Sequence, residues 1–222
     1  MAFKRFFHNG STSADLAAPL AAAIQDALDH AGFDDLTANT SVSSNTVTVF
    51  QGEAATAANT FFTCVTGGDP PLTVYMNSGV YNSKIFGLYL SVIATKHAVA
   101  LLGCITDGTS NGGVIITKDT AGDYVQITNA AASIPSQSLN APQILPRGSS
   151  LAAIPTLQVS TDYTFGVTTL ANFPTVNDGS EVRFLKDVLI ALTGQMRTDG
   201  DCTIDGTPYY CIGGRWYLKD SE

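Results

Sequence analysis

The C-terminal stretch reads Cys202-Thr-Ile-Asp-Gly-Thr-Pro-Tyr-Tyr-Cys-Ile-Gly-Gly-Arg-Trp-Tyr-Leu-Lys-Asp220, and it says more about the fold than any other part of the chain. Two turn-forming pairs, Asp205-Gly206 and Gly213-Gly214, each lie between runs of residues that favour β-strands. Such pairs supply the positive φ angles that tight hairpin turns need. The spacing therefore predicts a three-strand antiparallel meander over residues 199–222.

Aromatic residues are concentrated at both ends of the chain. Those in the meander combine a large apolar area with a polar tip, which suits either half-buried strands or a subunit interface. Pro208 removes one backbone donor, so its strand is expected to lie at an edge or to have a free stretch. The N-terminal phenylalanines are expected to fold back onto the domain or to dock on a neighbour. The candidate subunit contacts are Phe3, Phe6, Phe7, Tyr209, Tyr210, Trp216 and Tyr217.

An amphipathic helix is expected over residues 13–31, inside an N-terminal segment that we place at residues 1–36. Ser13 is placed to cap its start, and Asp15 lies in the first turn, where a negative charge suits the helix dipole. Gly32 is expected to end the helix in a left-handed conformation. One apolar stripe recurs every fourth residue, through Leu16, Leu20, Ile24 and Leu28.

Residues 37–198 are expected to form a β-rich main domain. The polar residues at 37–45 predict a linker or turn, and a hairpin is expected around Thr120-Ala-Gly122. Runs of alternating or β-branched residues predict strands at 46–50, 60–66, 72–76, 85–94, 97–105, 114–119 and 123–128. The expected fold class is therefore α+β, mainly antiparallel β with one N-terminal amphipathic helix.

The apolar run at residues 85–105 is long enough to be compared with a membrane span. Lys96 and His97 interrupt it at the centre, where a lysine costs about 2.5–3.5 kcal/mol on insertion. The two halves are rich in Val, Ile and Leu. Two buried strands joined by a tight turn near Thr95-Lys96 explain the run better.

The stretch 129–155 contains four prolines and little charge, so long regular elements are not expected in it. It is either an extended arm over a neighbouring subunit or a long loop over its own sheet. Residues 156–167 are expected to return to a strand. The apolar run 182–192 fits either a short helix or a buried strand pair, and the sequence leaves both open.

The composition restricts the class of protein. Only 14% of the 222 residues are charged, below the usual quarter for soluble domains, which fits a protein that covers its surface with neighbours. A monomer coated with Thr, Ser, Asn and Gly fits this composition as well. The net charge of −8 argues against nucleic-acid binding, which needs phosphate-neutralising charge, and against adsorption to an anionic membrane.

No motif for catalysis, cofactor binding or metal binding is found, so no residues are assigned to these roles. The four cysteines form no zinc pattern, and free thiols in a reducing cytosol are expected. A two-residue turn at Asp205-Gly206 would set Cys202 opposite Tyr209, which argues against a Cys202–Cys211 disulfide. A carbohydrate-binding module and a hydrolase with a dispersed carboxylate site stay open as alternatives, the hydrolase because carboxylate pairs leave no local motif.

Two stretches resemble virion structural proteins of tailed bacteriophages. These are Gly112-Gly-Val-Ile-Ile-Thr-Lys-Asp-Thr-Ala-Gly-Asp-Tyr-Val125 and the ending Asp205-Gly-Thr-Pro-Tyr-Tyr-Cys-Ile-Gly-Gly-Arg-Trp-Tyr-Leu-Lys-Asp220. In such proteins a hairpin of the second kind is a frequent last element. The resemblance implies a neck, tail or baseplate subunit that forms a ring of identical copies and contacts other virion proteins. It also implies assembly in the host cytoplasm, a final place in the virion, and no enzymatic activity.

Overall fold

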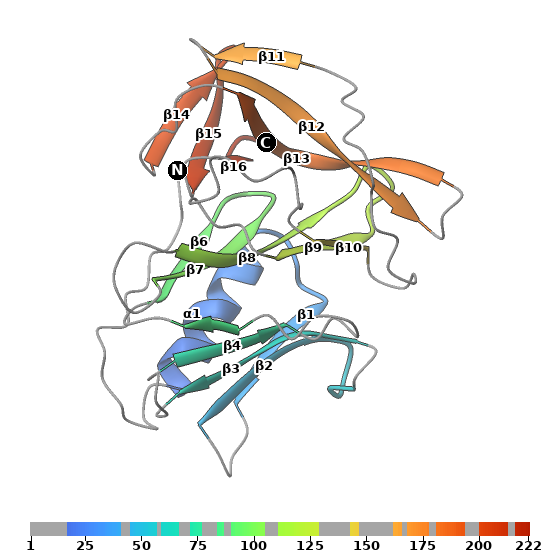
Figure 1. Ribbon diagram of the computed structural model, residues 1–222. Helices are drawn as coiled ribbons and strands as arrows, with labels where there is room; N and C mark the ends of the chain where they lie inside the picture. The colour runs from blue at the N-terminus through green and yellow to red at the C-terminus, as the bar shows by residue number, and fades with distance from the viewer. Residues whose placement is uncertain are drawn as a thin grey trace.

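The computed structural model describes residues 17–40, 45–56, 59–66, 72–76, 84–86, 90–104, 111–128, 143–146, 162–165, 168–177, 181–193, 200–212 and 216–222. In these residues the chain forms one helix and sixteen strands. The strands pair antiparallel in three sheets, which Figure 1 shows stacked one above another. The predicted class, mainly antiparallel β with one helix, is confirmed at this level. The candidate contacts Phe3, Phe6 and Phe7 lie outside the described residues.

The first sheet is a meander whose five strands follow chain order. The strands are β1 (Leu36–Thr40), β2 (Thr46–Gln51), β3 (Thr60–Thr66), β4 (Leu72–Met76) and β5 (Lys84–Phe86). The strands predicted at 60–66 and 72–76 are confirmed at both ends. The polar linker predicted at 37–45 is wrong for residues 37–40, because β1 pairs with β2 along its whole length. Pairing with a neighbour has overridden the weak strand preference of its polar residues.

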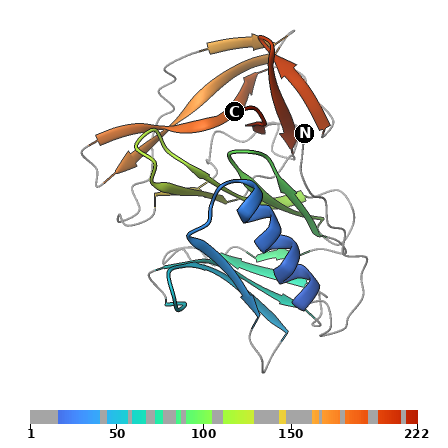
Figure 2. The same ribbon diagram turned by 180° about the vertical axis from the view of Figure 1, so that it is seen from behind.

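The helix α1 (Ala17–His30) ends where the sequence predicts, whereas its predicted start at residue 13 lies outside the described residues. Gly32 has a φ of 70°, the left-handed conformation expected of it. Its N–H donates to the Asp29 carbonyl, and the Phe33 N–H donates to the Leu28 carbonyl. This pair of hydrogen bonds is a Schellman cap, which satisfies carbonyls that a helix end otherwise leaves open. Figure 2 shows α1 in front of the first two sheets.

The second sheet has the order β10-β9-β8-β7-β6. Its strands are β6 (Leu90–Ala94), β7 (Val99–Cys104), β8 (Asn111–Lys118), β9 (Tyr124–Thr128) and β10 (Gln143–Pro146). The predicted turn within 85–105 is confirmed, since Thr95 N–H donates to the Ala98 carbonyl around Lys96 and His97. The single strand predicted at 85–94 is wrong, because β5 pairs in the first sheet and β6 in the second. Among the described residues no helix is long and apolar enough to cross a membrane.

The third sheet contains the C-terminal meander and has the order β11-β12-β13-β16-β15-β14. Its strands are β11 (Asp162–Phe165), β12 (Thr168–Asn177), β13 (Glu181–Thr193), β14 (Gly200–Ile204), β15 (Thr207–Ile212) and β16 (Trp216–Lys219). Residues 182–192, for which the sequence left a short helix or a pair of strands open, belong to one long strand, β13. The predicted register is confirmed, with Cys202 opposite Tyr209, around a turn where Asp205 and Gly206 have φ 47° and 80°. The meander shares its sheet with β11–β13, because β16 pairs with β13.

The second sheet is buried on both faces. Alternate residues of its strands enter two different cores, as Val92 and Ile93 do on β6. One core, which we call the helix-side core, lies between this sheet, α1 and the first sheet and contains Leu28 and Val49. The other, the C-terminal core, lies between this sheet and the third sheet and contains Trp216. A central layer needs apolar residues on both sides, which explains the continuous apolar run that the sequence shows.

The proline-containing stretch 129–155 is only partly described. Gln143–Pro146 forms β10, which pairs with β9 at the edge of the second sheet. This short strand agrees with the prediction that the stretch lacks long regular elements. The choice between an arm over a neighbour and a loop over its own sheet falls on residues outside the described part.

Candidate functional site

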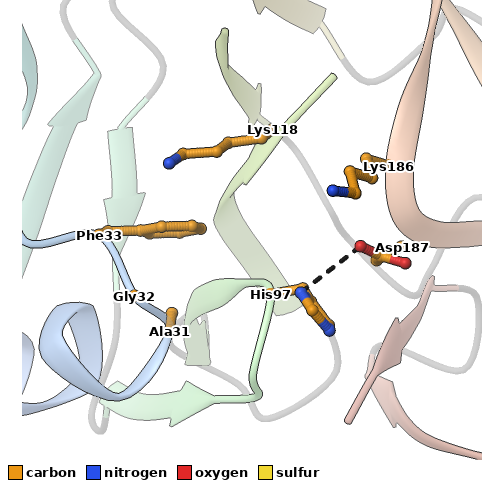
Figure 3. A pocket seen from close by; sticks show the side chains of 7 residues that line it. All are labelled: Ala31, Gly32, Phe33, His97, Lys118, Lys186 and Asp187. Atoms are coloured by element: carbon orange, nitrogen blue, oxygen red, sulfur yellow. Dashed lines mark ion pairs between the residues drawn. The ribbon is translucent and has the colours of Figure 1, made fainter. Parts of the chain in front are cut away.

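A cavity of about 210 Å³ lies where the end of α1 and the second and third sheets meet (Figure 3). The helix end contributes Ala31, Gly32 and the ring of Phe33. The remaining lining comes from the β6–β7 turn, the end of β8 and the middle of β13, through His97, Lys118, Lys186 and Asp187. Elements that are far apart in the chain therefore place four ionisable side chains around one space.

An irregularity in β13 places Lys186 and Asp187 at the cavity. Asn172 lies opposite Leu189 and Pro174 lies opposite Phe184, so residues 185–188 face one residue of β12. Such a bulge bends a strand and redirects its side chains. Asp187 has a φ of 62°, a left-handed conformation that aspartate adopts more readily than most residues but that is still less favourable than an ordinary strand conformation. The local strain must be offset by contacts that the bulge makes with its surroundings.

The end of the β8–β9 hairpin supplies those contacts. Thr117 is fully buried, and its hydroxyl lies 3.2 Å from the His97 carbonyl oxygen and 3.3 Å from that of Lys186. Asp119 forms an isolated bridge with Leu185, and the Thr120 N–H donates to the Phe184 carbonyl at 2.9 Å. The bulge is therefore fastened to the second sheet, and the cavity has a fixed wall on this side.

The carboxylate of Asp187 has two nitrogen partners, one from Lys219 and one from His97. The Lys219 Nζ lies 3.1 Å from one carboxylate oxygen, and the His97 Nδ1 lies 3.5 Å from the other. The His97 Nε2 lies 2.6 Å from the Ser221 carbonyl oxygen. The two ring nitrogens thus lie near two different oxygens, one of the Asp187 carboxylate and one of the Ser221 carbonyl. The same contacts tie the end of the chain to the β6–β7 turn.

The two lysines of the cavity have no such partner. Within the described part of the chain, no carboxylate lies at ion-pair distance from Lys118 or Lys186. The Lys118 Nζ instead lies over two aromatic rings, 5.4 Å from the Phe33 centroid and 4.8 Å from the Tyr124 centroid. A cation over an aromatic face gains a favourable interaction but keeps its charge.

Tyr124 forms the aromatic floor next to Lys118. Its ring meets the Phe33 ring edge to face at a centroid distance of 5.3 Å, and its hydroxyl donates to Asp35. Burial raises the pKa of Tyr124, and the hydrogen bond to Asp35 raises it further. The phenol therefore stays neutral at physiological pH and gives Lys118 an aromatic face, not a phenolate partner.

The chemistry of this cavity favours anions over metal ions. Lysine, histidine and a single carboxylate that already makes two contacts give positive charge in excess. Among the described residues, no group of three or more His, Cys, Asp or Glu side chains is placed to hold a metal ion. The arrangement is suited to binding a small anion.

The aromatic residues predicted as subunit contacts in the meander lie away from this cavity. Trp216, Tyr217 and Tyr210 are 1%, 0% and 6% exposed, so they are core residues of this chain. In this chain they pack against its own core, and a contact between these three side chains and a neighbouring subunit stays a prediction. Tyr209 is half-buried and is the one of the four that keeps exposed area.

The sequence did not single out Lys118, Lys186 and Asp187. One signal was present, because the charged pair Lys186-Asp187 interrupts the apolar run that begins at Phe184. Two adjacent charges in a buried strand indicate a bulge or a site, but nothing local identifies the residues that they meet. Comparison with protein-family models, curated proteins and solved structures found no match for this chain.

Proposed function

We propose that this chain is a structural subunit that acts by assembling with identical copies and with other proteins, as neck, tail or baseplate proteins of tailed-phage virions do. The observation that carries the proposal is the outer part of the β12–β13 hairpin. The resemblance of residues 205–220 to the closing hairpin of such virion proteins adds to it, and it is the only basis for naming a virion.

The β12–β13 hairpin extends past the rest of its sheet (Figure 1). On its outer sides, β11 pairs with β12 at Thr168–Ala171, and β16 pairs with β13 at Val188–Ile190. Beyond these points, Pro174–Asn177 and Glu181–Phe184 pair with each other. Among the described residues, one backbone hydrogen bond reaches an outer edge of these two segments, from the Thr120 N–H to the Phe184 carbonyl. We call this two-stranded part the ribbon.

A two-stranded ribbon is marginal in water by itself, and here β10 and β8 of the second sheet lie near β12 and β13 without adding a further strand to the ribbon. Its outer edges also carry backbone N–H and C=O groups that a strand of another chain can pair with. Addition of such a strand would give the ribbon a third strand and the neighbour a defined register. The ribbon therefore supports assembly through strand addition.

The charge content supports the same proposal. With 14% charged residues, the chain has few groups to keep its surface solvated and separate from other copies. The net charge of −8 favours protein partners over nucleic acid or an anionic membrane, since both of these carry negative charge themselves.

Shortening the ribbon tests the proposal. Replacing residues 175–183 with Asn-Gly joins Pro174 to Phe184, which already lie opposite each other, through a favourable two-residue turn. We expect the shortened chain to fold, as judged by circular dichroism and urea unfolding, but to lose the oligomer that light scattering detects for the full chain.

A matched control replaces only residues 178–180 with Asn-Gly and leaves the paired part of the ribbon in place. This control is expected to assemble like the full chain. The proposal fails if the full chain is a monomer at all concentrations and binds glycans on an array, or if the folded, shortened chain assembles normally. Electron microscopy of the native particle with a labelled antibody tests the virion location separately.

A further inference from the structure

We propose that the cavity beside Phe33 binds a small oxyanion, a carboxylate or phosphate group held between Lys118 and Lys186. This inference goes beyond the proposed assembly and does not rest on it.

The charges of the cavity are the first argument. Lys118 comes from the second sheet and Lys186 from the third, and Figure 3 shows them on opposite sides of the cavity, with the Lys118 ammonium group turned toward Phe33. Neither has a carboxylate partner in the described part of the chain. Each lysine brings one positive charge to the lining of the cavity, and an anion placed between them would be attracted by both.

Asp187 does not supply the missing negative charge. Its carboxylate oxygens are taken up by Lys219 at 3.1 Å and by His97 at 3.5 Å. The Asp187 carboxylate is thus engaged by Lys219 and His97, and the charges of Lys118 and Lys186 stay unbalanced among the residues that line the cavity. An external anion is the simplest way to balance them, because charge-assisted hydrogen bonds to oxyanions are strong and lysine is a common phosphate ligand.

The C-terminal end of α1 carries partial negative charge on its free carbonyls, but the cap reduces this charge next to the cavity. The carbonyl oxygens of Leu28 and Asp29 accept hydrogen bonds from Phe33 and Gly32 in the cap, so these two point their electron pairs at donors within the chain. What the helix end offers the cavity is mainly the apolar surface of Ala31 and Phe33. A ligand with a small apolar part beside its oxyanion would use that wall.

The size of the cavity limits the ligand. Its volume of about 210 Å³ lies below the roughly 300–1,000 Å³ of pockets that hold drug-sized ligands. Inorganic phosphate or the carboxylate end of a short acid fits into that space. The ligand class is thus a compact oxyanion.

The backbone at Asp187 agrees with a dedicated site. The bulge at residues 185–188 and the left-handed φ of Asp187 are local costs, and together they turn Lys186 and Asp187 to the cavity. Strained conformations of this kind concentrate at binding and catalytic sites. The backbone conformation supports the proposal only together with the positive charges of Lys118 and Lys186.

The test titrates the full chain with inorganic phosphate and, separately, with acetate at constant ionic strength, and measures heat by calorimetry and the midpoint of thermal unfolding. We expect saturable binding of at least one of the two anions, with a rise in the midpoint. Phosphate alone would identify a phosphate site, and acetate alone a carboxylate site. The absence of saturable binding for both anions would overturn the proposal.

Variants assign the binding to the cavity. Lys118→Met and Lys186→Met keep much of the apolar stem and remove the charge, and each is expected to weaken binding by about tenfold or more. Lys96→Met is the matched control, since Lys96 is an exposed lysine of the adjacent turn that does not line the cavity, and it should leave the affinity unchanged.

Unfolding in anion-free buffer shows whether each variant is folded before it is titrated. Lys186 is exposed, so its replacement is expected to be tolerated even if that of Lys118, which covers two rings, is not. The proposal is wrong if the folded Lys186→Met chain binds as tightly as the wild type, or if Lys96→Met loses as much affinity.

Discussion

The buried position of Cys64 changes the pKa of its thiol. It lies on β3 with no exposed area, in the helix-side core, and is a free thiol. Burial raises the pKa of its thiol from 9.0 to about 12, because the apolar surroundings cannot solvate a thiolate. The folded chain therefore holds this proton more tightly than the unfolded chain does.

The first prediction at this scale concerns alkaline pH. The contribution of Cys64 to stability is complete below pH 9 and is lost as the pH rises from 9 toward 12, since only the unfolded chain releases the proton easily. The free energy of unfolding should fall by about 1.4 kcal/mol per pH unit from this group. Urea unfolding of the wild type and Cys64→Ala at several pH values measures it, and equal slopes for the two proteins would contradict the assignment.

The second prediction concerns Trp216, which is 1% exposed in the C-terminal core. Trp216→Ala should destabilise the fold by about 3–5 kcal/mol, because it leaves a large cavity between the second and third sheets. Urea unfolding gives the value, and Trp216→Phe is the control that should lose less. A stable Trp216→Ala chain with defective association would instead support Trp216 as a subunit contact.

At the scale of elements, the cap of α1 and the bulge of β13 decide where the cavity lies. The cap turns the chain so that Phe33 lies against Lys118 and Tyr124. The bulge brings Lys186 to the same space from the third sheet. Both elements use left-handed backbone, at Gly32 without strain and at Asp187 with it.

Gly32 gives the prediction at this scale. A Cβ added there meets nothing within 4 Å, so the cost of Gly32→Ala comes from its φ of 70° alone, about 1–2 kcal/mol. Thermal unfolding measures the loss. Gly32→Asn is the matched variant and should cost less, because asparagine tolerates this conformation better. Equal stability of Gly32→Ala and the wild type would mean that the cap adopts another conformation.

At the scale of the whole molecule, two cores lie on either side of the central sheet, and a smaller buried cluster around Tyr217 lies on the other face of the third sheet. The meander at the C-terminus completes the third sheet and encloses one of the two cores. Removing it would expose the apolar face of the central sheet as well, so the meander is needed for the fold whatever its role in assembly. The ribbon, by contrast, extends from that sheet, and we expect the C-terminal core to persist when it is shortened, because Leu185 and Val188 are kept.

Much of the local structure could be predicted because it depends on neighbours in the chain. Asp205-Gly206 sets the register of β14 and β15, Gly32 ends α1, and Lys96-His97 forms the turn between β6 and β7. Each follows from φ preferences or from a change in apolar periodicity, which act over a few residues. Local signals failed at residues 37–40 and 85–94, where pairing with a strand from elsewhere decided the outcome.

The C-terminal meander and the end of α1 were thus determined by the sequence alone. Only the tertiary structure decided that Trp216 is buried, and that Phe33, Lys118 and Lys186 surround one cavity. The reason is physical: the stacking of sheets and the bulge at residues 185–188 depend on contacts between strands far apart in the chain. Such contacts form cooperatively, and no short pattern of residues specifies which of them will meet.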